Sequence, residues 1–156
     1  MDTSDRDCPF CAIVREEDPT AREVLRTGEY VAFFPTEPAT LGHTMVVPLR
    51  HVPRFMDLTE MEARDLGAGA LRVSNLVYST LQPEGLNIIQ SNGRAAEQTV
   101  PHVHVHVVPR WGRDAFDEIW PATTNFSESA KDATLQRLRD ADQNLGKPPN
   151  ASNSHN

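Results

Sequence analysis

Three histidines at alternate positions form the part of the sequence best suited to chemistry. The stretch VPHVHVHVVPR, residues 100–110, contains His102, His104 and His106, half of the six histidines in the chain. Side chains alternate between the faces of a β-strand, so a strand here presents the imidazoles on one face and the intervening valines on the other. Core packing does not require this arrangement, because buried imidazoles need partners and protonated neighbours repel one another. We therefore predict a functional histidine cluster.

Neighbouring imidazoles can take different chemical roles. One ring can attack phosphorus, a second can donate a proton or bind phosphate, and a third can bind a metal ion. The attacking ring needs a hydrogen-bond acceptor for its other nitrogen, and a backbone carbonyl of the same strand can supply one. Nearby polar residues are positioned to hold phosphate oxygens; they are Ser91, Asn92, Gln98 and Thr99. The pattern favours chemistry on a phosphate ester or amide.

The only two cysteines form a C-x-x-C pair, Cys8-Pro9-Phe10-Cys11. In a cytosolic protein such a pair is more often half of a metal site or a redox dithiol than a structural disulfide. A thioredoxin-like motif follows a strand and opens a helix, and no strand is predicted before this pair. The metal interpretation is therefore favoured. Zinc normally takes four ligands, and histidines are the obvious source of the other two.

Composition indicates one globular domain. The chain has 156 residues, of which 38% are hydrophobic and 24% charged. A net charge of -7 argues against a general nucleic-acid binder, which needs a basic face. No run approaches the roughly 18 apolar residues of a membrane span. The N-terminus is polar and acidic, so we expect no signal peptide and a cytoplasmic location.

Hydrophobic periodicity predicts the elements that position these residues. Strands are expected at 29–35, 43–49 and 85–93 and in the histidine segment, with residues 12–26 holding a short amphipathic piece and a loop. A long helix is expected at 58–81, where Thr59 and Glu62 form a capping box, and a second at 127–145. The predicted fold class is α+β, a largely antiparallel meander with the long helix packed on one face. We expect residues 1–126 to form the domain, with its core at 8–110, and the tail 146–156 to be disordered.

The histidine segment fits the pattern His-φ-His-φ-His-φ-φ, where φ is apolar, and the chain resembles the histidine triad (HIT) family. The resemblance is to the zinc-containing branch of these nucleotide hydrolases and transferases. It extends from Cys8 to Arg110 and includes CPFC, LGHTMVVPLRH and NGRAAEQTVPHVHVHVVPR in the family's order. It implies a HIT-like antiparallel sheet.

The resemblance implies roles for the histidines. His104 matches the nucleophile that attacks the α-phosphate and carries a covalent nucleotidyl group. His106 matches the histidine that contacts phosphate and assists the leaving group, and His102 matches the first triad position. His43 matches a histidine lining the site. The implied activity is hydrolysis of a nucleoside phosphoramidate or dinucleoside polyphosphate, or nucleotidyl transfer.

The resemblance also implies a metal site, substrate contacts and a partner. A closed, structural zinc would be held by Cys8, Cys11, His51 and His102, and no catalytic metal is required. Gln98 and Thr99 match groups that hydrogen-bond the phosphate and its bridging atom. The family's common unit is a homodimer whose sheets join. We expect a nucleotide substrate and no nucleic-acid polymer or membrane as partner.

Three positions depart from the family pattern. Pro35 stands where an Asp or Asn often contacts the ribose, Glu97 replaces a glycine before Gln98, and Ser91 replaces an Asn. Proline offers no side-chain acceptor, and a carboxylate close to the phosphate would repel it. These departures favour an alternative, a zinc-stabilised nucleotide-binding or scaffold protein with little turnover. A thiol redox protein is a third possibility.

Overall fold

The computed structural model describes residues 5–116, 119 and 124–145. The chain divides into two compact units between Asp117 and Glu118. The first unit contains the sheet and the histidine segment, and the second contains the C-terminal helix. The predicted domain boundary at residue 126 stays a prediction.

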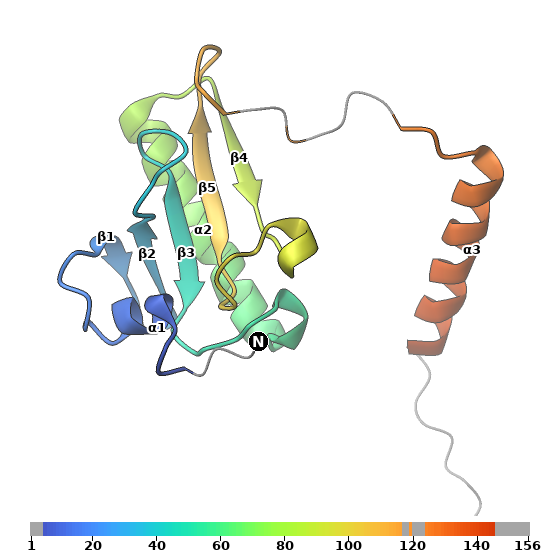
Figure 1. The fold of residues 1–156 in the computed structure, drawn as a ribbon, viewed down its shortest axis with the longest axis horizontal. Helices are drawn as coiled ribbons and strands as arrows, with labels where there is room; N and C mark the ends of the chain where they lie inside the picture. Colours follow the sequence, from blue (N-terminus) through green and yellow to red (C-terminus); the bar gives the residue numbers. More distant parts are fainter. Residues whose placement is uncertain (1–4, 117–118, 120–123, 146–156) are drawn as a thin grey trace, which may run out of the picture. The chain divides into compact units, whose positions relative to one another are not determined.

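The first unit has five strands and one long helix, with a short helix near its N-terminus (Figure 1). In chain order the elements of the two units are α1 (Pro9–Val14), β1 (Arg22–Arg26), β2 (Tyr30–Phe34), β3 (Thr44–Pro48), the 3-10 turn η1 (Phe55–Asp57), α2 (Glu60–Leu81), β4 (Gly85–Ile89), the 3-10 turn η2 (Arg94–Ala96), β5 (Val105–Arg110) and α3 (Glu128–Leu145).

The strands form one antiparallel sheet in the order β1-β2-β3-β5-β4. The first three strands follow one another as a meander, and β5 returns to lie between β3 and β4 (Figure 1). The histidine strand is therefore paired on both sides. Its side chains are held in register by two ladders of backbone hydrogen bonds.

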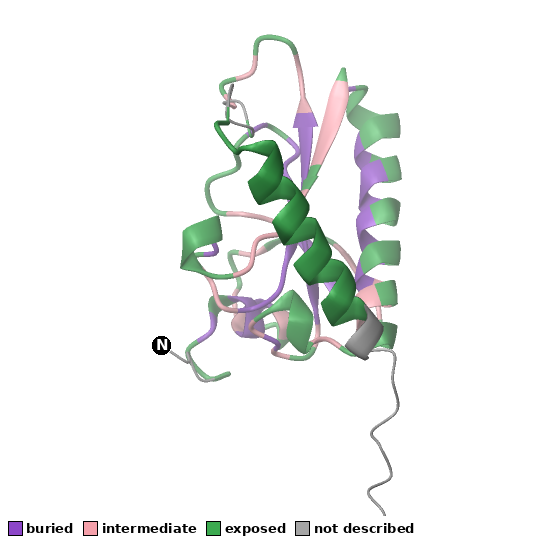
Figure 2. Cartoon of the chain, turned by 90° about the vertical axis from the view of Figure 1, so that its right-hand side faces the viewer, coloured by how far each residue is buried: buried purple, intermediate pink, exposed green. Residues whose placement is uncertain are grey.

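The helix α2 covers one face of the sheet. Its capping box is present: the Thr59 hydroxyl accepts from the backbone N–H of Glu62, and the Glu62 carboxylate accepts from the backbone N–H of Thr59. The helix therefore begins at Glu60, within the predicted range 58–81. Leu66, Ala70 and Val73 recur on its buried stripe, while its outer side is exposed (Figure 2).

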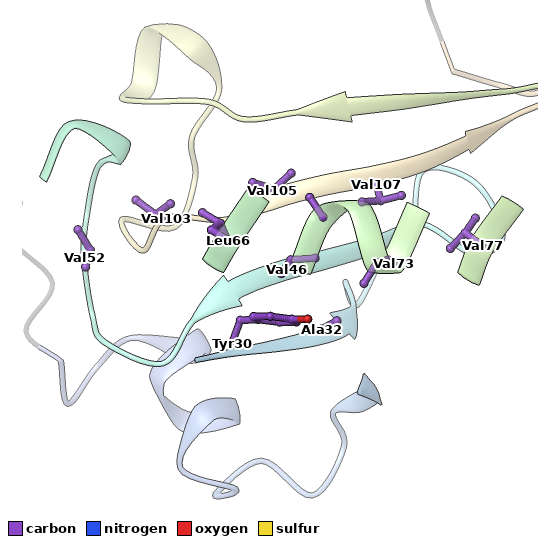
Figure 3. Close-up of a cluster of buried hydrophobic side chains, with 11 residues drawn as sticks. Tyr30, Ala32, Val46, Val52, Leu66, Val73, Val77, Val103, Val105 and Val107 are labelled. Carbon is purple, nitrogen blue, oxygen red and sulfur yellow. The ribbon is translucent and has the colours of Figure 1, made fainter. Parts of the chain in front are cut away.

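The main hydrophobic core lies between α2 and the sheet (Figure 3). It includes Val46 of β3 and all three valines that alternate with the triad histidines: Val105 and Val107 of β5, and Val103 just before that strand. These valines are buried, as the alternation predicts. The histidines must then point to the opposite face of the sheet.

A second, smaller core covers part of that opposite face. The helix α1 packs Phe10 and Ile13 against apolar side chains of β2 and β3, including Phe33 and Met45. Both cysteines belong to this cluster. Thus α1 brings the C-x-x-C pair to the face that carries the histidines.

Three predicted boundaries were wrong. Residues 22–26, which lie in the segment 12–26 predicted as a short amphipathic piece and a loop, form the edge strand β1. Its side chains are charged and mostly exposed, so the sequence gives little sign of a strand. The strand forms by pairing with β2, with a bulge between Glu23 and Leu25. The histidine strand begins only at Val105. The strand predicted at 85–93 ends at Ile89, before the polar turn.

The second unit contains α3, which confirms the helix predicted at 127–145. The Ser127 hydroxyl accepts a hydrogen bond from the backbone N–H of Ala130, in the first turn. The predicted disordered tail 146–156 lies outside the described residues. In the part of the chain that the structure describes, no helix is both long and apolar enough to cross a membrane.

Candidate active site and metal centre

The sheet register places the triad on the face opposite α2. His106 of β5 lies opposite Met45 of β3 on one side and Ile89 of β4 on the other, and Met45 in turn lies opposite Phe33. Residues directly opposite one another point to the same side of a sheet. His104 precedes the strand but keeps the alternation, and its ring centroid lies 4.7 Å from that of His106.

The ring of His104 has a defined tautomer. Its Nδ1 donates a hydrogen bond of 2.7 Å to the backbone carbonyl oxygen of His102. A carbonyl can only accept, so the proton of the neutral ring is on Nδ1 and the lone pair is on Nε2. This is the arrangement that a nucleophilic imidazole requires, and the acceptor is a nearby backbone carbonyl of the triad segment, although both residues precede β5.

A chain of hydrogen bonds also sets the tautomer of His106. The backbone N–H of Ala39 donates to His43 Nδ1 over 3.1 Å, so the proton of neutral His43 is on Nε2. His43 Nε2 lies 2.8 Å from His106 Nδ1 and donates to it. His106 then carries its proton on Nε2. Two adjacent rings thus offer a lone pair, on His104, and a donor, on His106.

These tautomers require neutral rings, and burial keeps them neutral. Burial, followed by the proximity of His104, lowers the pKa of His43 to about 4. Burial, then His104 and His43, lowers the pKa of His106 to about 4. Burial also lowers the pKa of His104, while its hydrogen bond to the His102 carbonyl acts in the opposite direction. Because the pKa values of all three rings are lowered, the neutral forms are favoured at pH 7.

We expect the free energy of unfolding to fall as the pH decreases from about 6.5 to about 4, because an unfolded histidine gains its proton near pH 6.5 while folded His43 and His106 do not until about pH 4. Each such histidine adds a slope of up to about 1.4 kcal/mol per pH unit within this window, and above it the stability contribution is complete. Urea unfolding between pH 4.5 and 8 measures the slope. His43→Gln keeps a donor and an acceptor but cannot take up a proton, so it should reduce the slope by up to about 1.4 kcal/mol per pH unit. An unchanged slope would contradict the lowered pKa of His43.

Four predicted metal ligands converge at the other end of this face. Ligand atoms of Cys8, Cys11, His51 and His102 all lie within 4.8 Å of one another, and this is the one such group among the residues that the structure describes. His102 Nδ1 lies 3.6 Å from Cys8 Sγ and 3.5 Å from Cys11 Sγ. His51 Nδ1 lies 3.2 Å from Cys11 Sγ. A tetrahedron with ordinary Zn–S and Zn–N bonds has edges of about 3.6 Å between sulfur and nitrogen.

The donor set also fits zinc chemically. His102 Nε2 donates to the Pro48 carbonyl oxygen over 3.0 Å, so its Nδ1 presents a lone pair to the two sulfurs. Both cysteines are free and buried. Burial is the largest of the effects that raise the pKa of Cys11. A redox dithiol has instead an exposed thiol whose pKa is lowered, so the redox interpretation is not favoured. The cluster could therefore hold a zinc ion.

The predicted phosphate ligands fall into two groups: two amide side chains that bind the backbone of nearby loops, and two hydroxyl side chains that do not. The Gln98 amide accepts from the backbone N–H of Gly93 and donates to the Pro53 carbonyl, each over 2.7 Å. The Asn92 amide accepts from the backbone N–H of Phe55. These two side chains are engaged in holding the loops around the 3-10 turns. Ser91 is half-buried and Thr99 is exposed, and neither hydroxyl makes a hydrogen bond within the described residues.

Glu97, which replaces the family's glycine, has the left-handed backbone conformation that glycine favours, with φ of 65° and ψ of 19°. The turn nevertheless forms, and the backbone N–H of Glu97 donates to the Arg94 carbonyl. A left-handed residue other than glycine costs of order 1 kcal/mol.

We expect Glu97→Gly to stabilise the fold by about 0.5–1 kcal/mol, because relief of this strain exceeds the entropy that glycine adds to the unfolded chain. The midpoint of urea unfolding, at constant m value, measures the change. Glu97→Ala is the control, since it removes the carboxylate and keeps the strain. Equal stabilisation by both substitutions would show that charge, rather than backbone conformation, is the cause.

Sequence reasoning missed two contacts at this site. The first is the backbone N–H of Ala39, which orients His43 from four residues away. The second is Phe10, whose ring centroid lies 5.2 Å from that of His104 in an edge-to-face arrangement. An apolar residue between two candidate metal ligands was a signal for the second contact, because the ligands restrict where its side chain can lie.

An antiparallel five-stranded sheet with a helix on one face and three alternating histidines on the other defines a histidine triad protein. The chain belongs to this family: the family model described as "HIT domain" matches residues 16–112. This confirms the resemblance noted in the sequence and the predicted fold class.

Relatives and solved structures agree with this assignment. The chain is 33% identical over 103 residues to the adenosine 5'-monophosphoramidase hnt1 of Schizosaccharomyces pombe, an alignment covering 66% of this chain and 74% of the relative. It is 41% identical over 85 residues to the asymmetrical bis(5'-nucleosyl)-tetraphosphatase of the same yeast, covering 54% and 47%. The crystal structure of a Zn-bound histidine triad family protein from Mycobacterium smegmatis is similar with a TM-score of 0.68 and 30% identity, over 88% of this chain and 99% of that one.

Proposed function

We propose that the protein is a nucleotide hydrolase or nucleotidyl transferase that cleaves a P–N or P–O bond at the α-phosphate of a nucleoside 5'-phosphate derivative. The observation that carries this proposal is the tautomer of His104, whose Nδ1 is bound to a backbone carbonyl while Nε2 keeps its lone pair. The adjacent His106, oriented by His43, supplies a complementary donor. Relatives named as a phosphoramidase and a tetraphosphatase support this substrate class.

The reaction takes place in two steps. First, His104 Nε2 attacks the α-phosphorus and a P–Nε2 bond forms. The bond to the leaving group breaks, and the leaving atom takes the electron pair and, for an amine, a proton from solvent. His106 Nε2–H donates a hydrogen bond to the phosphate and stabilises the charge that develops there. Ser91 and Thr99 hydroxyls are candidates to hold the remaining oxygens.

In the second step a water molecule attacks phosphorus and releases a proton to solvent, and the P–Nε2 bond breaks with its electron pair returning to Nε2. The nucleoside monophosphate leaves with the oxygen of the water, and His104 returns to its neutral form. Throughout, the His102 carbonyl keeps the Nδ1 proton in place. If another nucleophile replaces water, the same intermediate gives nucleotidyl transfer.

Zinc has a structural role in this proposal. Four protein ligands, Cys8, Cys11, His51 and His102, would complete the coordination of a structural zinc ion and leave no position for substrate or water. When bound, the ion would join α1, the segment after β3 and the start of the triad. The chemistry is carried by imidazoles alone.

The test is turnover of a fluorogenic adenosine phosphoramidate, with dinucleoside polyphosphates as the P–O comparison. We expect hydrolysis of at least one class, together with a nucleotidyl-protein adduct detectable by mass spectrometry after rapid acid quench. Tight nucleotide binding without turnover of any substrate would instead favour the scaffold alternative. A panel of nucleosides with and without ribose hydroxyls tests the consequence of Pro35, which directly follows β2 and has no polar side-chain group.

The proposal includes a homodimer that acts in the cytoplasm. Strand β4 forms one edge of the sheet, and its Ile88 is 58% exposed, which supports pairing with a second copy at that edge. The two free cysteines are consistent with a reducing compartment.

A further inference from the structure

Phe10 connects the metal centre to the nucleophilic histidine. It lies between the two cysteines, with one residue separating it from Cys8 and none from Cys11. Cys8 is the N-terminal cap of α1, and its carbonyl accepts from the backbone N–H of Ala12 over 3.1 Å. Because both ends of this short segment carry metal ligands, a bound ion restricts the backbone on either side of Phe10.

The Phe10 ring is part of the wall around His104. The two ring planes are 83° apart at a centroid distance of 5.2 Å, and the ring is also edge-on to His102 at 6.0 Å. It also packs edge-to-face against Phe33, with 5.4 Å between the ring centroids. Phe10 is 8% exposed and His104 is 4% exposed, so this contact is inside the protein.

The orientation of His104 depends on more than its one hydrogen bond. The Nδ1 hydrogen bond to the His102 carbonyl sets the tautomer and limits the tilt of the ring, and some rotation about the Cα–Cβ and Cβ–Cγ bonds remains. The edge-to-face contact with Phe10 restricts that rotation, and the ring of His106, at 4.7 Å and 80°, restricts it from another side. The direction of the Nε2 lone pair thus depends on the position of α1.

The geometry points to Phe10 as a positioning residue that makes the orientation of His104 depend on occupancy of the Cys₂His₂ site. With the site filled, α1 is held at both cysteines and Phe10 stays against the nucleophile. With the site empty, α1 is held by apolar packing and hydrogen bonds alone, and the contact loosens. The ion would then influence the rate of a reaction in which it takes no part. The expected effect on the rate rests on the proposed function, whereas the expected effect of zinc on the orientation of His104 does not.

The structural part is tested by NMR of the free protein. An aromatic ring edge-on to an imidazole shifts the imidazole proton signals through its ring current. In the wild type we expect removal of zinc by a chelator to move the Cδ2–H and Cε1–H signals of His104. In Phe10→Leu, which has no ring, the same treatment should move them less than half as far. His104 signals that do not respond to zinc removal in the wild type overturn the inference, whatever the substrate proves to be.

The catalytic part is tested by single-turnover formation of the nucleotidyl adduct with zinc-loaded protein. We expect Phe10→Leu to slow this step about 10-fold with KM changed less than about 2-fold, because a small misplacement of a nucleophile affects rate more than binding. Phe10→Tyr keeps the ring and should stay within about 2-fold of the wild type. If Phe10→Leu does not fold, Phe10→Met, with an unbranched side chain of similar length, replaces it.

Phe33→Leu is the matched control. It removes a ring of the same size from the same apolar cluster, and Phe33 has no ring contact with a histidine among the described residues. We expect it to reduce stability and leave the single-turnover rate and the His104 signals nearly unchanged. Equal slowing by Phe10→Leu and Phe33→Leu would show that Phe10 acts only through packing. If the proposed function is wrong, no nucleotidyl adduct forms in any variant, yet the zinc-dependent shifts of His104 remain.

Discussion

Replacement of His104 by alanine is expected to lower kcat/KM for nucleotide hydrolysis by at least about 10⁴-fold, the scale observed when a covalent nucleophile is removed. The reason is the Nε2 lone pair, which the hydrogen bond from Nδ1 to the His102 carbonyl leaves available for phosphorus. The other histidines cannot substitute for it. His106 Nε2 and His43 Nε2 carry protons, and His102 Nδ1 faces the two cysteine sulfurs.

The measurement combines steady-state turnover with mass spectrometry of quenched reactions. The wild type should show a nucleotidyl adduct and His104→Ala should show none. His106→Ala is the matched control from the same strand face. It should slow turnover by about 10²–10³-fold while the adduct still forms, because the nucleophile is intact. Nucleotide binding by His104→Ala, measured by calorimetry, verifies that the pocket persists. A rate that survives the loss of His104 removes it as the nucleophile.

The second large effect is expected from loss of the metal. Cys11→Ser should abolish stoichiometric zinc and lower the free energy of unfolding by about 4 kcal/mol, the value for a ligand present at 1,000 times its Kd. For a chain of this size such a change lowers the Tm by about 8–16 °C. Cys11 is suited to this test because its Sγ contacts the Nδ1 atoms of both His51 and His102.

Zinc analysis, thermal unfolding and chelation together check this expectation. Wild-type protein treated with a chelator should unfold at the temperature of Cys11→Ser, and the variant should be insensitive to the chelator. A protein purified without zinc, with a Tm unaffected by added zinc, would contradict the metal assignment. Loss of zinc without loss of stability would show that the apolar cluster around Phe10 and Ile13 alone holds α1.

Local patterns were sufficient for much of the fold. The valines that alternate with the triad histidines predicted the two faces of the sheet segment correctly, since side-chain direction in extended backbone depends only on position parity. Thr59 and Glu62 predicted the start of α2, because a capping box is made within four residues. The ligand set Cys8, Cys11, His51 and His102 came from the family resemblance, and the structure brings these four residues together.

Other features depended on partners that the local sequence does not reveal. Strand β1 has a charged, mostly exposed sequence and forms because β2 pairs with it. Gln98 was expected to bind phosphate, and in the structure its amide joins Gly93 to Pro53. The roles of Gln98 and Asn92 in binding substrate stay predictions.

The sequence by itself determined which chemistry the chain can perform, because residue types and their alternation place three imidazoles on one face of an extended segment. The tertiary structure decided which atoms of His106 and His102 carry a proton, whereas the proton of His104 is set locally by the His102 carbonyl. The proton of His106 is set through His43 by the backbone of Ala39, and that of His102 by the carbonyl of Pro48. A tautomer depends on the hydrogen-bond partner of each nitrogen, and these partners lie more than fifty residues from the triad, so only folding brings them together.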